Sequence, residues 1–161
     1  MVFWYLGISL AFVWNVFRSP ALDYRLVMLG SVLPLVEVVH GGPWLLHALV
    51  FVVALLGLIM VTTQRRRLLR RRLISLPIGL MMGLVLNGSW ATKSVFGWPF
   101  FGWDFPGGGL PELQWALGVR IVLDLMGLAA LAWCWRAFGF ADRANRELFI
   151  RTGHLNRALV A

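Results

Sequence analysis

The stretch VLPLVEVVHGGPWLLHALVF, residues 32–51, is apolar except for three groups that could bind a metal or move a proton. They are Glu37, His40 and His47, and a Gly-Gly-Pro turn lies between the two histidines. Because a tight turn folds the second half of the stretch back against the first, we expect the three side chains to meet. A carboxylate and two imidazoles suit Zn²⁺, Mn²⁺ or Mg²⁺ to differing degrees, Zn²⁺ best, and leave a position for water.

Three further polar side chains lie in apolar segments, at Asn87, Arg120 and Asp124. Arg120 and Asp124 are one helical turn apart and share a face. Ionisable groups near the centre of a membrane cost about 2.5 to 3.5 kcal/mol each on insertion scales, so they tend to be paired or functional. In a metal-dependent reaction Asp124 is the expected base or fourth ligand, and Arg120 the group that neutralises a substrate anion.

The same residues also have a structural interpretation, which the spacing alone favours. In it Glu37 pairs with Arg120, the histidines hydrogen-bond at a helix interface, and Asp124 is held by its neighbour Arg120. One carboxylate and two histidines at this spacing do not form a tight metal-binding motif. The choice between a metal site and a polar helix contact therefore depends on the geometry.

The composition is that of an integral membrane protein. Of the 161 residues, 60% are hydrophobic and only 14% are charged, and the mean hydropathy is +0.77. Apolar runs approach the roughly 20 residues that a membrane-spanning helix needs, and none alternates as a barrel strand would. The sequence therefore predicts an all-α bundle of five membrane segments, at about residues 1–17, 25–39, 44–63, 73–91 and 115–135.

The basic residues predict the orientation of these segments. Thirteen of the fifteen lie in the loop before the second segment, in QRRRLLRRR, or after residue 135. The positive-inside rule places them in the cytoplasm, with the N-terminus outside and the C-terminus inside. Residues 1–135 are then the membrane bundle, and 136–161 a basic cytoplasmic tail that forms an amphipathic helix or stays solvated. The short basic loops offer no domain for binding nucleic acid.

Small residues recur at every fourth position in two segments. Such stripes let helix backbones approach closely where lipid gives no hydrophobic drive for association. They predict contacts within the bundle, or a dimer face. The two stripes are Gly7, Ala11 and Asn15, and Ser75, Gly79, Gly83 and Asn87.

The stretches LGSVLPLVEVVHGGPWLLHAL and LPIGLMMGLVLNGSWATKSVFGWPFFG give a family resemblance over roughly residues 20–103. They resemble the bacterial membrane-bound, metal-dependent hydrolase-like family of small inner-membrane proteins. That family has the blocks G-x-x-x-P-D-x-D, H-R-G-x-T-H-S and H-x-x-x-D, followed by a segment like W-P-F. The matching positions are Gly30, Pro34, Glu37, His40, Gly41, His47, Trp98, Pro99 and Phe100.

The chain also departs from that pattern at positions where the family has ligands. Leu35 stands at the first Asp, Gly83 at the third-block His, and Asn87 at its Asp. Leu and Gly supply no ligand atoms, so the resemblance implies a degenerate member in the bacterial inner membrane. Two functions follow as expectations. One is metal-dependent hydrolysis of a lipid-like phosphate or ester, in a shared polar pocket in the outer half of the bundle. That pocket would be formed by Glu37, His40, His47, Asn87, Arg120 and Asp124. The other is a non-catalytic scaffold or accessory subunit with a membrane partner or a second copy.

Overall fold

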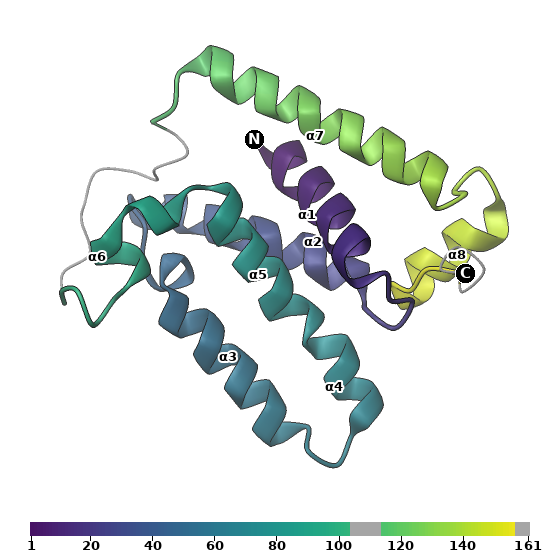
Figure 1. Ribbon diagram of the computed structural model, residues 1–161, viewed down its shortest axis with the longest axis horizontal. Coiled ribbons are helices and arrows are strands. Elements are labelled where there is room, and N and C mark those ends of the chain that lie inside the picture. Colours follow the sequence, from purple (N-terminus) through teal and green to yellow (C-terminus); the bar gives the residue numbers. More distant parts are fainter. Residues whose placement is uncertain (104–113, 157–161) are drawn as a thin grey trace.

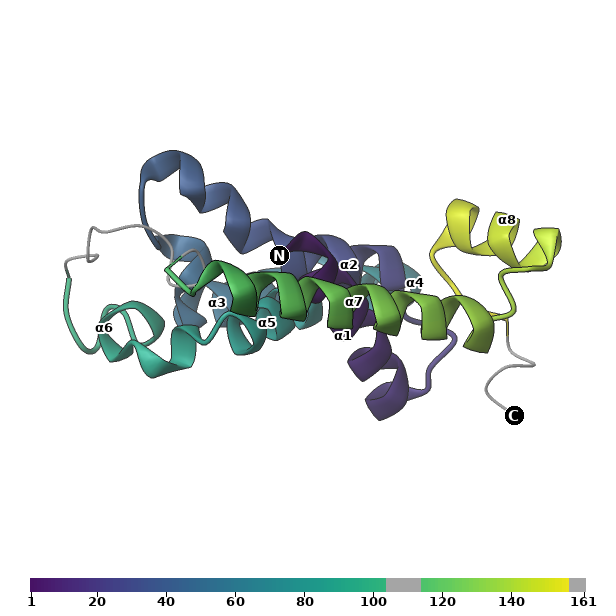
Figure 2. The same ribbon diagram turned by 90° about the horizontal axis from the view of Figure 1, so that it is seen from above.

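All regular structure in the described part of the chain is helical. The computed structural model describes residues 1–103 and 114–156, apart from the side chains of Val38 and His40, and no strand occurs among them. The predicted all-α class is therefore confirmed. The molecule is elongated, with α6 (Lys93–Phe96) and α8 (Arg143–Thr152) at opposite ends of its long axis (Figures 1 and 2).

The apolar segments correspond to helices, several of which are interrupted. In chain order the structure has α1 (Val2–Phe17), α2 (Tyr24–Val32), the 3₁₀ helices η1 (Leu33–His40) and η2 (Leu45–His47), α3 (Leu49–Thr62), α4 (Arg67–Leu73), α5 (Ser75–Leu86), η3 (Ser89–Ala91), α6, α7 (Leu117–Ala137) and α8. Among the described residues, one helix taken by itself, α7, is long and apolar enough to cross a membrane, while α1 and α3 are apolar but shorter.

Local signals in the sequence account for the helix ends. Arg18 ends α1 in a left-handed conformation with φ of 41°, and Pro20 follows, which has no N–H with which to continue a helix. Asp23 caps α2, because its side chain accepts the Arg25 N–H. Pro34 removes one i to i−4 hydrogen bond, and the chain continues as η1 with the tighter 3₁₀ winding.

Glycines allow the closest helix contacts in the bundle. A Cβ added to Gly7 of α1 would lie 2.1 Å from the carbonyl oxygen of Gly127 in α7. A Cβ added to Gly79 of α5 would lie 2.1 Å from the carbonyl oxygen of Val27 in α2. Only glycine fits at such backbone contacts, so the predicted contacts within the bundle are confirmed at Gly7 and Gly79. Asn15, the last member of the first stripe, is exposed.

The bundle is built from two close helix pairs. α7 packs along α1, and α2 packs along α5, while α1 also contacts α2 and α3 contacts α5 (Figure 1). A buried cluster of Leu10, Val13, Val27, Tyr24 and Phe138 joins α1, α2 and the end of α7. Outside these contacts, α7 presents a largely exposed apolar face.

Candidate functional site

The predicted Glu37 region is a hairpin of two 3₁₀ helices. η1 carries Glu37 away from α2, the chain turns at Gly41, and η2 carries His47 back toward α3. Gly41 has φ of +77°, in the left-handed region that favours glycine. The turn that the Gly-Gly-Pro sequence predicts is therefore present, and it brings the two arms of the hairpin together.

Glu37 and His47 meet at the base of this hairpin. Both side chains are almost fully buried, with Glu37 3% exposed and His47 0% exposed. Oε2 of Glu37 lies 2.6 Å from Nδ1 of His47. In the neutral tautomer that donates to this carboxylate, the hydrogen is on Nδ1 and the lone pair is on Nε2. The carboxylate thus fixes the orientation of the imidazole ring.

The carboxylate of Glu37 also accepts two backbone hydrogen bonds. The N–H of Trp44 donates to Oε2 at 2.7 Å, and the N–H of Leu46 donates to Oε1 at 2.6 Å. Both oxygens therefore have N–H partners. A small apolar cavity of about 210 Å³ lies beside the carboxylate, lined by Val36, Trp44, Leu45, Leu46 and Phe51.

Of the three predicted metal ligands, the structure brings Glu37 and His47 together. Within the described side chains, no group of three or more His, Cys, Asp or Glu residues gathers where it could hold a metal ion. The side chain of His40, the third predicted ligand, lies outside the described part of the chain. Glu37 is placed as a residue that orients a histidine, the position that second-sphere carboxylates take at metal centres. The metal site stays a prediction.

Asp124 lies at the N-terminus of α1. Its Oδ1 accepts the backbone N–H of Trp4 at 3.1 Å, and its Oδ2 lies 2.7 Å from the amino group of Met1. A helix N-terminus has unpaired N–H groups and a partial positive charge, so a carboxylate there is stabilising. Asp124 of α7 thus caps α1 from a neighbouring helix.

Arg120 and Asn87, the other two predicted site residues, lie on α7 and at the end of α5. Arg120 is half-buried one turn before Asp124, and within the described residues no ion pair joins it to Asp124 or Glu37, while its Nε has no hydrogen-bond partner. The indole N–H of Trp4 donates to the carbonyl of Leu86 at 3.4 Å. Asn87 follows directly, and its Oδ1 accepts the N–H of Ser89 at 2.8 Å.

The predicted polar residues therefore have two sets of contacts. Glu37 and His47 form one, on η1 and η2. Asp124 forms the other, on α7 and the start of α1. Each carboxylate contacts hydrogen-bond donors of the fold. Within the described residues, the two pairs that the structural interpretation expected, Glu37 with Arg120 and Asp124 with Arg120, are not formed.

A third polar cluster, which sequence reasoning missed, lies near α4 and α8. Asp23 is 0% exposed, and its Oδ2 lies 2.8 Å from Nε of Arg72 while its Oδ1 lies 3.3 Å from Nε of Arg25. Its backbone N–H donates to Oγ of Ser75 at 2.9 Å. Burial raises the pKa of Asp23, but hydrogen bonds and charges from Arg25 and Arg72 outweigh it, so the pKa is below its usual value of 3.8.

The same cluster attaches the end of α8 to the bundle. The N–H of Tyr24 donates to the carbonyl of Gly153 at 2.9 Å, and Nδ1 of His154 lies 3.1 Å from the carbonyl oxygen of Leu22. An Asp directly before a helical run is a capping signal, and it was the one local sign of this cluster. Its long-range partners have no such sign.

Comparisons with known protein families, curated proteins and solved structures found no match to this chain.

Proposed function

We propose that the chain is a multi-pass protein of a bacterial inner membrane, with five apolar segments, the N-terminus outside and the C-terminus inside. The many exposed large apolar side chains support this, because such side chains are costly to expose to water. They lie along α1, α3 and α7 and include Phe3, Phe12, Val16, Val53, Leu58, Val61, Leu117, Val122 and Leu125.

The interrupted helices are compatible with this arrangement. α2 has nine residues and η1 has eight, and together they extend by up to about 30 Å at 1.5 and 2.0 Å per residue. The arginines of α4 and α8 lie at the end of the molecule away from α6 (Figures 1 and 2). This placement agrees with one cytoplasmic side for the basic residues.

Within the membrane, we infer that the protein acts without catalysis, as a helical scaffold or accessory subunit of a larger membrane complex. This inference rests on the hydrogen bonds of the Glu37 carboxylate. Its two oxygens accept N–H groups from Trp44, Leu46 and His47. Hydrocarbon has no water that could hydrogen-bond the unpaired backbone N–H groups at a broken helix. Other groups of the protein, here a side chain, must therefore accept them. Asp124 has a similar role for α1.

Two measurements test the membrane location and the absence of catalysis separately. A protein with five membrane segments is expected to resist extraction from membranes by alkaline carbonate. Reporters fused after residues 20, 64 and 141 are expected to lie on the cytoplasmic side. Elemental analysis of the purified protein is expected to show no stoichiometric Zn, Mn or Mg. Stoichiometric metal that is lost in His47→Ala would contradict the scaffold function.

Metal-dependent hydrolysis is the second candidate, and the orientation of His47 favours it. A carboxylate on Nδ1 directs Nε2 toward a ligand and makes the imidazole a better donor. His40 and His47 would then bind the ion, and a bound metal would activate water toward a phosphate or ester. This candidate predicts that Glu37→Gln lowers metal affinity by about 10- to 100-fold, as changes at second-sphere carboxylates do.

A further inference from the structure

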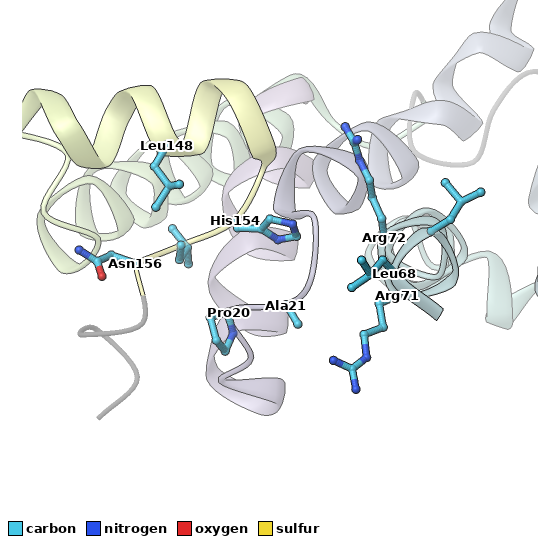
Figure 3. A pocket seen from close by; sticks show the side chains of 10 residues that line it. Pro20, Ala21, Leu68, Arg71, Arg72, Leu148, His154 and Asn156 are labelled. Carbon is cyan, nitrogen blue, oxygen red and sulfur yellow. The ribbon is translucent and has the colours of Figure 1, made fainter. Parts of the chain in front are cut away.

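A cavity of about 730 Å³ lies between α4, the connection from α1 to α2, and the segment that follows α8 (Figure 3). It is separate from the Glu37 and Asp124 contacts. Leu148 points from α8 toward this segment, and His154 projects into the space between the segment and α4 (Figure 3). Three parts of the chain that are distant in sequence therefore form the walls.

The lining combines apolar and cationic groups. Leu68, Leu148 and Leu155 supply apolar surface, while Arg71 and Arg72 lie on the α4 wall. Leu68 is 84% exposed, directly beside a run of arginines. Leucines and arginines mixed in this way are typical of surfaces that lie at the boundary between lipid headgroups and acyl chains.

The cationic groups are not fully neutralised. Asp23 faces two guanidinium groups, those of Arg25 and Arg72, so this cluster keeps a net positive charge. Within residues 1–103 and 114–156, the side chain of Arg71 makes no hydrogen bond or ion pair. Arg71 and Arg72 project from α4 in different directions (Figure 3). Arg71 is therefore free to bind an anion, and Arg72 is held at the wall by Asp23.

We propose that this pocket binds an anionic phospholipid of the cytoplasmic leaflet, with the phosphate against Arg71 and an acyl chain against the leucines. The assignment rests on the membrane location proposed above, since the arginine-rich end would then lie at the level of the lipid phosphates. Guanidinium groups bind phosphate oxygens through paired N–H donors. The apolar wall distinguishes a lipid from a free phosphate ion.

Titration of the purified full-length chain in detergent tests the proposal, with native mass spectrometry to measure bound lipid. Phosphatidylglycerol is expected to bind about fivefold or more tightly than phosphatidylcholine, and Arg71→Gln to weaken phosphatidylglycerol about fivefold. Arg65→Gln removes the same charge from an exposed position outside the pocket and is expected to change binding by less than about twofold. Leu148→Gln, at the apolar wall, is expected to weaken the lipid as well.

Three outcomes would overturn the proposal. They are equal affinity for the two lipids, equal losses in Arg71→Gln and Arg65→Gln, and displacement of phosphatidylglycerol by millimolar inorganic phosphate. The last would assign the pocket to a free anion. A chain that carbonate extracts from membranes would overturn the membrane location instead, whereas a carbonate-resistant chain without lipid preference would overturn the lipid site alone.

Discussion

The carboxylate of Glu37 lies 2.6 Å from Nδ1 of His47, across a turn in which helical hydrogen bonding is interrupted. The same carboxylate accepts the N–H groups of Trp44 and Leu46, at the start of the returning arm. Backbone donors at a helix start have no partner within the helix. Glu37 thus supplies from one arm of the hairpin the acceptors that the other arm lacks.

Glu37→Gln is expected to destabilise the protein by about 2 to 4 kcal/mol, because it leaves buried N–H groups facing an amide with a single acceptor oxygen. Thermal unfolding in detergent, followed by circular dichroism, measures this. The matched control is Glu147→Gln, which removes an exposed i, i+4 pair with Arg143 and is expected to change stability by about 0.5 kcal/mol or less. Equal melting temperatures for the two variants would contradict the role given to Glu37.

Gly79→Ala is expected to destabilise the bundle by about 1 to 3 kcal/mol, since its Cβ would lie 2.1 Å from the Val27 carbonyl oxygen and α2 and α5 would have to separate. Gly57→Ala in α3 is the control, because a Cβ there meets nothing within 4 Å. That change is expected to be neutral or to stabilise α3 by up to about 1 kcal/mol through helix propensity. Unfolding in detergent that ranks the variants in the opposite order would argue against close packing of α2 on α5.

Hydropathy and residue spacing predicted where most of the helices lie, because the length and composition of an apolar run decide whether it forms one helix. The apolar run at 115–135 became α7, Leu117–Ala137, because its length and composition are those of one uninterrupted helix. The run at 25–39 contains Pro34, and it became α2 followed by η1. Local chemistry thus locates the helices and where one of them changes its winding.

The site was predicted only in part, because the partners of a buried charge depend on how distant segments pack. Glu37 and His47 are ten residues apart, and the turn between them made their contact predictable. Asp124 and Trp4 are 120 residues apart, and no local pattern connects them. Asp23, at the start of α2, and Arg72, in α4, are 49 residues apart, and no local pattern connects them either.

Asp23→Asn is expected to destabilise the protein at neutral pH, because the charged form is the one that Arg25 and Arg72 bind. The pKa of Asp23 is lowered in the folded protein from 3.8. Its stabilising contribution is therefore complete above the unfolded-state pKa, near pH 4, and is lost as pH falls through the lower folded-state pKa. The difference in melting temperature between wild type and variant should be large at pH 7 and shrink below pH 4.

Asp142→Asn is the control for this experiment. Asp142 caps α8 by accepting the Ala144 N–H at 3.1 Å, and Asn caps a helix about as well as Asp. The melting temperature of Asp142→Asn should equal that of wild type both at pH 7 and at pH 3. A wild-type advantage over Asp23→Asn that persists unchanged at pH 3 would show that the charge of Asp23 is not what stabilises the cluster.

Variants of Asp124 distinguish the scaffold from the hydrolase most directly. In the scaffold its carboxylate caps the start of α1, whereas in the hydrolase it acts on the substrate. Asp124→Asn keeps an acceptor for the Trp4 N–H but loses the charge at the helix N-terminus, so a loss of about 1 kcal/mol is expected. Asp124→Leu removes the acceptor too and is expected to lose about 1 to 3 kcal/mol. Unfolding in detergent should therefore rank wild type, Asn and Leu in that order. A catalytic base would instead give two variants as stable as wild type and equally inactive in a phosphate-ester assay, and that result would favour hydrolysis over the scaffold.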